Sequence, residues 1–183
     1  LTVDAPGVTS ISLSPTTLVG GAPSTGTVTL SDVAPAGGAV VNLSSNSGAA
    51  TVPASVTVLE GETTATFTVD TVAVGSTTTA TITGSYHGSR STTLTINAPG
   101  LTSVSLSPAA LVGGNSSTGT VTLSSPAPAA GAVVTLSSDI GAATVPVDEP
   151  RVGDASRAAC TLGRAAVGST TTATITGNFN GPQ

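Results

Sequence analysis

The chain has 183 residues, only 7% of them charged, and a formal net charge of −5 with four Lys and Arg residues in total. It therefore has no basic cluster to displace the counterions of nucleic acid, and no apolar run near the roughly 20 residues of a membrane-spanning helix. We expect neither nucleic-acid binding nor membrane insertion. With one Tyr, two Phe and no Trp or Met, the expected core is aliphatic, which excludes an enzyme built around a deep aromatic pocket.

The sequence contains two copies of one unit. A shift of 93 residues places Ala5 on Ala98 without a gap, and 54 of the 90 aligned positions are identical. This period matches a whole sandwich domain and is longer than an ordinary solenoid repeat. The sequence therefore predicts one repeat over residues 5–97 and a second over residues 98–183.

Within the first copy, apolar residues alternate with Ser and Thr, which is typical of half-buried strands and not of helices. Gly, Pro and Ser separate these runs at spacings that suit a sandwich. The pattern predicts seven strands, at residues 8–14, 25–31, 39–45, 54–59, 63–70, 77–85 and 91–97. The expected inward residues are Ile11, Leu13, Val28, Leu30, Val41, Leu43, Val56, Val58, Phe67, Val69, Ala80, Ile82, Leu94 and Ile96.

The two ends of the chain differ in how they align with the last strand of the repeat. Residues 1–4 align with 94–97, which predicts that they are the last strand of a preceding copy. Gln183 aligns with Arg90, so the second sandwich is expected to lack its last strand within this chain. Two explanations stay open: the chain is a piece of a longer array, or a donor strand fills the vacant edge of the next molecule. The candidate donor residues are Leu1, Thr2 and Val3.

Three runs of the first copy resemble a known repeat type. Ser12-Leu13-Ser14-Pro15, Thr25-Gly26-Thr27-Val28-Thr29-Leu30 and Val52-Pro53-Ala54-Ser55-Val56 are similar to the tandem bacterial immunoglobulin-like (Big-type) repeats of large secreted and cell-surface proteins. The resemblance covers the whole chain. It implies immunoglobulin-like sandwiches and a spacer or stalk role in an extracellular or cell-surface bacterial protein. It transfers no catalytic, cofactor-binding or metal-binding residue.

One segment departs from the repeat. Residues 147–157 share no residue with 54–64, and the stretch 147–164 holds three of the four arginines and the only cysteine. Pro150 also removes a ladder donor from the strand expected there. Drift in a tolerant edge strand and a specialised loop that contacts a partner both remain open. The candidate contact residues are Asp148, Glu149, Arg151, Asp154, Arg157 and Arg164.

The residue types of catalytic and metal sites are scarce. One His and one Cys are too few for a zinc site, and a nucleophile at Cys160 lacks a nearby base because His87 lies in the other copy. We therefore expect no enzyme, no metal and no cofactor. His87 aligns with the Asn of an Asn-Gly pair, which favours a left-handed turn. Tyr86 is expected to pack, and Cys160, which aligns with Phe67, to be a small buried hydrophobe.

The sequence thus predicts an all-β chain of two tandem seven-stranded immunoglobulin-like β-sandwiches that serves as a spacer or stalk module. The short linker 97–100, with its Pro, is expected to be semi-rigid. Expected partners are neighbouring identical repeats, in the same chain or head to tail between chains, and a surface glycan or protein. Two alternatives remain: a filament subunit joined by donor-strand pairing, and an adhesive or glycan-binding module that uses residues 148–164 or the threonine-rich faces.

Overall fold

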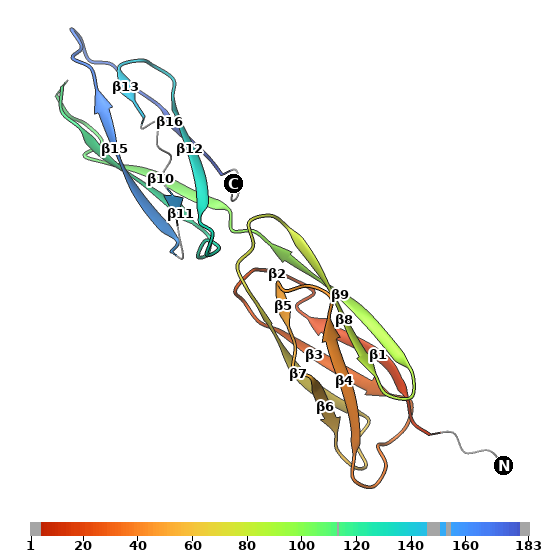
Figure 1. The fold of residues 1–183 in the computed structure, drawn as a ribbon. Coiled ribbons are helices and arrows are strands. Elements are labelled where there is room, and N and C mark those ends of the chain that lie inside the picture. Colours follow the sequence, from red (N-terminus) through yellow and green to blue (C-terminus); the bar gives the residue numbers. More distant parts are fainter. Residues whose placement is uncertain (1–4, 113, 146–150, 153–154, 180–183) are drawn as a thin grey trace. The chain divides into compact units, whose positions relative to one another are not determined.

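The computed structural model describes residues 5–112, 114–145, 151–152 and 155–179, and all of them are strand, turn or loop (Figure 1). The chain divides into two compact units, Leu1–Asn97 and Ala98–Gln183. Among the described residues, no helix of membrane-spanning length and apolarity occurs.

The first unit is a sandwich of two sheets. One has the strand order β1-β3-β7-β5 and the other β2-β9-β8-β4-β6. All neighbouring strands are antiparallel except β2 and β9, which run parallel. This order is that of immunoglobulin domains, with an A-B-E-D sheet over a G-F-C sheet. The strands are β1 (Val8–Ser14), β2 (Thr17–Val19), β3 (Ser24–Leu30), β4 (Ala39–Ser45), β5 (Ala50–Thr51), β6 (Ser55–Val58), β7 (Thr64–Thr71), β8 (Thr78–Ser85) and β9 (Ser89–Asn97).

The core of the first unit lies between these sheets and is aliphatic apart from Phe67. The predicted inward residues are buried, with the exception of Val56, which is half-buried in the short edge strand β6. Leu94 and Ile96 of β9 are both 0% exposed, so this strand closes one side of the core.

The predicted number of seven strands is too small for this unit. The two strands missed, β2 and β5, have three and two residues, which is too short for an alternating pattern to show. Although β2 is short, it borders the outer edge of β9, because Thr17, Leu18 and Val19 pair with residues 95–97 of that strand.

The chain enters and leaves the first sandwich at opposite ends. The N–H of Val8 donates to the carbonyl of Tyr86 (3.0 Å), beside the turn between β8 and β9. At the other end of β9, the N–H of Gly20 donates to the carbonyl of Asn97 (3.0 Å). A nine-residue strand such as β9 is about 30 Å long, so entry and exit are separated by the length of the domain.

The second unit repeats this plan with fewer strands among its described residues. One sheet has the order β10-β11-β15-β13 and the other β14-β12-β16, so that β16 is an edge strand. The strands are β10 (Leu101–Ser107), β11 (Ser117–Leu123), β12 (Ala132–Ser138), β13 (Ala143–Thr144), β14 (Arg151–Val152), β15 (Arg157–Arg164) and β16 (Ile175–Phe179).

Two segments of the second unit are irregular where their counterparts are strands. Residues 171–174 align with 78–81 of β8, which pair with residues 93–96 of β9. Residues 110–112 align with β2, which pairs with β9 alone. Since no described strand of the second unit stands in the place of β9, neither segment has the partner that makes its counterpart a strand.

Candidate functional site

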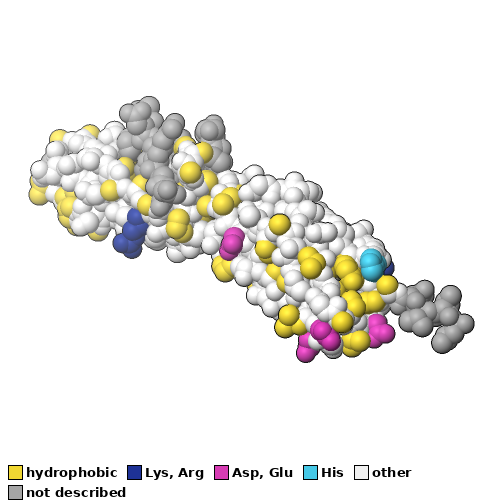
Figure 2. Space-filling model, turned by 60° about the horizontal axis from the view of Figure 1, so that its bottom comes forward, with side chains coloured by type: hydrophobic (Ala, Val, Ile, Leu, Met, Phe, Trp, Pro, Cys, Tyr) yellow, Lys and Arg dark blue, Asp and Glu magenta, His cyan; other side chains and the backbone are white. Residues whose placement is uncertain are grey.

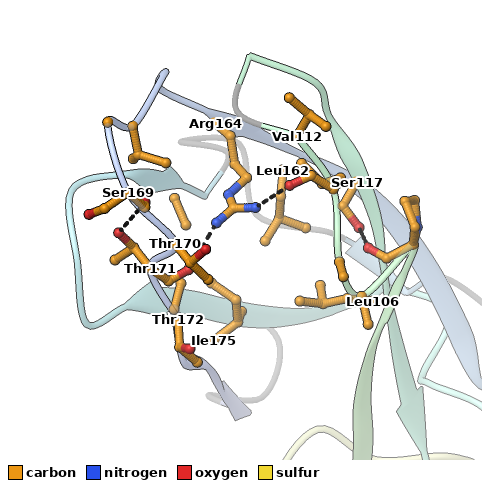
Figure 3. A pocket seen from close by; sticks show the side chains of 18 residues that line it. Leu106, Val112, Ser117, Leu162, Arg164, Ser169, Thr170, Thr171, Thr172 and Ile175 are labelled. Atoms are coloured by element: carbon orange, nitrogen blue, oxygen red, sulfur yellow. Dashed lines mark hydrogen bonds between the residues drawn. The ribbon is translucent and has the colours of Figure 1, made fainter.

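A groove with a cavity volume of about 660 Å³ lies open in the second unit (Figure 3). It is bounded by the two irregular segments, so it occupies the place that β9 fills in the first unit. We call it the edge groove. Its lining residues are Leu106, Pro108, Ala109, Ala110, Leu111, Val112, Ser117, Ala143, Leu162, Arg164, Val167, Gly168, Ser169, Thr170, Thr171, Thr172, Ala173 and Ile175.

The apolar residues of the edge groove have buried counterparts in the first unit. Ile175 is half-buried, whereas its counterpart Ile82 is 0% exposed in the core that contains Leu94 and Ile96. At the rim, the side chain of Val112 is 78% exposed. The groove is therefore part of the inner face of the sandwich, at a position where none of the described strands takes the place of β9.

Arg164, at the end of β15, crosses the edge groove (Figure 3). One terminal nitrogen of its guanidinium group donates to the carbonyl of Leu111, and the other donates to the carbonyl of Thr171, each at 3.3 Å. The side chain thus ties together the two irregular segments on either side of the groove.

The two carbonyls that Arg164 contacts belong to residues whose counterparts flank β9 in the first unit. Leu111 and Thr171 align with Leu18 and Thr78, and these two residues are the register partners of Ile96 on either side of β9. In the second unit the guanidinium group therefore bridges two segments whose counterparts in the first unit lie on either side of β9.

The predicted contact residues do not form one site in the described structure. Asp148, Glu149 and Asp154 lie outside the described residues, and Arg151 is described only as part of the backbone of β14. Arg157 and Arg164 begin and end β15, with Arg157 on its exposed face and Arg164 on the side that faces the groove. Among the predicted contact residues that the structure describes, Arg164 lines the edge groove and Arg157 does not.

The predicted donor residues Leu1, Thr2 and Val3 also lie outside the described residues. Their counterparts Leu94 and Ile96 show how such a pattern packs, because both are fully buried while Thr95 between them points to the other face of the sheet.

The turn prediction at His87 is confirmed, because its φ is +46°. The ring stacks on Tyr86 with a centroid distance of 4.3 Å, and its Nδ1 lies 3.1 Å from the carbonyl oxygen of Pro6. Tyr86 packs against the core of the first unit, as predicted. Both side chains therefore fix the end of the sandwich where the chain enters.

Cys160 is half-buried, so the prediction of a buried hydrophobe is correct only in part. Its counterpart Phe67 lies over Gly26, where a Cβ atom would collide with the ring. In the second unit the side chains of Leu162 and Cys160 both approach Gly119, where the Phe67 ring alone stands over Gly26 in the first unit. Desolvation raises the pKa of the Cys160 thiol, which disfavours the thiolate and makes the group less reactive.

In the described parts of the chain, no three His, Cys, Asp or Glu side chains come together as metal ligands would. On the face shown in Figure 2, charged side chains are few and scattered. The edge groove has apolar side chains, hydroxyl groups and one arginine among its lining residues.

Sequence reasoning did not identify the lining of the edge groove. A signal was nevertheless present, because several lining residues align with residues of the first copy that pair with 91–97. The bridge made by Arg164 had no such signal, because its counterpart Thr71 is too short to cross the groove.

No family model matches the chain, and no curated protein matches it in sequence. Among solved structures it is similar to the D0-D1 domain of intimin (13% identity, TM-score 0.43, 95% of this chain and 92% of that one). It is also similar to the Escherichia coli adhesin FdeC (17% identity, TM-score 0.43, 94% and 59%) and to the Yersinia pseudotuberculosis adhesin InvE (20% identity, TM-score 0.39, 84% and 51%). The strand order of the first unit establishes the immunoglobulin-like fold independently of these likenesses.

Proposed function

We propose that the chain is a spacer segment of an extracellular or cell-surface repeat protein. The observation that carries this proposal is the separation of entry and exit in the first unit, which lie at opposite ends of β9. Copies of a domain built in this way add length when they are joined in series, at about 30 Å for each copy.

The linker between the repeats supports a mechanical role. Three residues, Ala98, Pro99 and Gly100, separate the end of β9 from the start of β10. A linker this short, with φ fixed at Pro99, limits the range of orientations that neighbouring repeats sample. Arg157 and Arg164 of the predicted contact segment lie on different faces of β15, so these two arginines do not support a shared contact surface.

The proposal is tested by adding a repeat. A chain with a third copy, made by duplicating residues 5–97, is compared with the original chain by small-angle X-ray scattering. We expect the maximum dimension to grow by about 30 Å, the length of one domain. The matched control carries eight Gly-Ser residues inserted after Pro99, which is expected to broaden the distance distribution. An unchanged maximum dimension in the three-repeat chain contradicts the spacer role.

A further inference from the structure

We propose that one outer sheet face of the first unit binds a neutral polysaccharide. The face belongs to the neighbouring strands β1, β3 and β7 (Figure 1). The inference goes beyond the spacer role and does not depend on it, because it assigns a ligand to the surface of a single sandwich. Nine outward side chains of these strands, all Ser or Thr, form what we call the hydroxyl face. They are Ser10, Ser12 and Ser14 of β1, Thr25, Thr27 and Thr29 of β3, and Thr64, Thr66 and Thr68 of β7.

The strand register arranges these nine side chains in three rows. Neighbouring strands lie about 4.8 Å apart, and successive outward residues of one strand lie about 6.8 Å apart. The hydroxyl face therefore covers roughly 10 by 14 Å, which suits a short stretch of an extended sugar chain. The rows are Ser10-Thr29-Thr64, Ser12-Thr27-Thr66 and Ser14-Thr25-Thr68.

The hydroxyl groups of this face are available to a ligand. Thr27 and Thr29 are half-buried, and the other seven residues are exposed. Within the described chain none of the nine hydroxyls makes a hydrogen bond, whereas that of Thr9, in the same sheet, donates to the carbonyl of Thr29 at 3.1 Å. A hydroxyl donates one hydrogen bond and accepts two. The face thus presents donors and acceptors together, as the hydroxyls of a sugar chain do.

The surroundings of the hydroxyl face favour an uncharged and flexible ligand. None of its nine residues is charged, and Asp70 follows on the outer side of β7, in a chain with a net charge of −5. Anionic polymers are therefore repelled. Adjacent strands rotate by roughly 20 to 25° relative to one another, so the face is twisted. A polysaccharide follows such a twist, whereas a planar surface such as ice does not.

The second unit carries an interrupted version of the same face. Its β10 and β11 keep all six hydroxyl residues, but Arg157 and Ala159 of β15 stand where Thr64 and Thr66 stand in β7. The third row is complete, with Ser107, Thr118 and Thr161. The second unit is therefore expected to bind more weakly, and it supplies a matched template for a test.

The first measurement removes hydroxyls from the middle row. The full chain is incubated with insoluble cellulose, chitin and starch, and its depletion from the supernatant gives the affinity. Thr27→Val with Thr66→Val keeps the side-chain shape and suits a strand, but it is expected to weaken binding more than tenfold, at about fivefold for each hydroxyl. Tyr86 fluorescence during urea unfolding checks that the first unit stays folded.

Two control variants separate the hydroxyls from other effects. Thr27→Ser with Thr66→Ser keeps both hydroxyls and is expected to bind within twofold of the original chain. Thr81→Val with Thr93→Val makes the same change at a register pair of the other sheet, with the same degrees of exposure, and is expected to bind unchanged. Absence of binding to all three polysaccharides, or equal weakening by all three double variants, overturns the proposal. Adsorption to ice without binding to a polysaccharide also overturns it.

The second measurement completes the face of the second unit. Arg157→Thr with Ala159→Thr is expected to raise retention on the polysaccharide at least twofold, because the chain then carries two complete faces. Arg157→Val with Ala159→Val removes the charge without adding a hydroxyl and is expected to leave retention unchanged. Equal gains in both variants overturn the role of the hydroxyls. The spacer role is unaffected by either outcome, because it depends on where the chain enters and leaves the first unit.

Discussion

Identical residues are buried to different degrees in the two repeats. Ile82 is 0% exposed and Leu13 is 6% exposed, whereas their counterparts Ile175 and Leu106 are half-buried. These pairs have the same residue type and the same place in the repeat, so the difference arises from the neighbouring strand. β9 covers the first core, and no described strand covers the second. Burial in a sandwich is thus a property of strand partners as much as of the residue itself.

The repeats also differ in how they close the sheet edge beside this core. In the first repeat the hydroxyl of Thr71 donates to the carbonyl of Ala22 (2.6 Å) and accepts from the N–H of Gly21 (3.1 Å). In the second repeat Arg164 replaces Thr71 and reaches across the groove. The short-range hydrogen bonds of Thr71 thus have no equivalent at Arg164, whose side chain instead connects Leu111 with Thr171.

The largest expected effect comes from removing the side chains of β9 that cover the core of the first repeat. The double variant Leu94→Ala with Ile96→Ala is expected to cost the first unit about 4 to 10 kcal/mol of unfolding free energy, because each truncation leaves a cavity in a closed core. Tyr86 is the only tyrosine and there is no tryptophan, so intrinsic fluorescence during urea unfolding reports on the first unit alone.

The matched control for this variant is Thr93→Ala, on the exposed face of the same strand. It is expected to change the unfolding free energy by only about 0.5 kcal/mol. Equal costs for the control and the double variant contradict the view that β9 stabilises the repeat by covering its core.

The opposite change gives the second repeat a covering strand. Extending the chain after Gln183 with the sequence of residues 91–97 places the added Leu and Ile in register with the edge groove. Their burial is expected to stabilise the second unit by about 3 to 6 kcal/mol. Because Cys160 is the only cysteine, the rate of its reaction with a thiol reagent in urea follows the opening of this unit.

The control extension carries Asn in place of the added Leu and Ile. It keeps the length of the chain and removes the apolar burial, so we expect the Cys160 reaction rate of the original chain. If both extensions slow the reaction equally, the stabilisation does not come from filling the groove.

Much of this fold follows from the sequence. Alternation identified the long strands and the buried residues between them, because a half-buried strand imposes a period of two. It missed Leu18 and Ala34, which are buried although they lie in a three-residue strand and in a loop. The burial of such residues depends on tertiary neighbours and leaves no periodic trace.

The edge groove was only partly predictable. Alignment of the two copies gives its position, because the lining residues include counterparts of the residues that pair with 91–97 in the first copy. The contacts of Arg164 with Leu111 and Thr171 are not visible in that alignment, since they join a side chain to carbonyls 53 and 7 residues away. The divergent segment suggested a partner site, yet two of its arginines, Arg157 and Arg164, lie on different faces of β15.

A smaller effect is expected for a hydrogen bond that both repeats contain. The buried hydroxyl of Ser24 donates to the carbonyl of Pro15 (2.7 Å), and that of Ser117 donates to the carbonyl of Pro108 (2.8 Å). Ser24→Ala and Ser117→Ala are each expected to cost about 1 kcal/mol, because the carbonyl loses its donor. Tyr86 fluorescence and Cys160 reactivity measure the two costs separately. A cost confined to Ser24→Ala shows that the second repeat is already relaxed at this position.

The smallest expected difference between the repeats is a response to acid. Asn46 accepts the N–H of Thr81 at 2.8 Å, and its counterpart Asp139 accepts the N–H of Thr174 at the same distance. The backbone hydrogen bond from Thr174 lowers the pKa of Asp139 below its ordinary value of 3.8. Its contribution to stability is therefore present above the unfolded-state pKa and is lost as the pH falls through the lower folded-state pKa.

Asp139→Asn keeps the hydrogen-bond acceptor and removes the charge, so it is expected to flatten the pH dependence of melting of the second unit between about pH 5 and pH 2. Asn46→Asp is expected to introduce the same dependence into the first unit, because the acceptor position is geometrically equivalent. Calorimetric melting of the two variants beside the original chain measures both changes. Parallel pH profiles for all three chains contradict the assignment of this acid response to one carboxylate, and place its origin in other acidic residues of the chain.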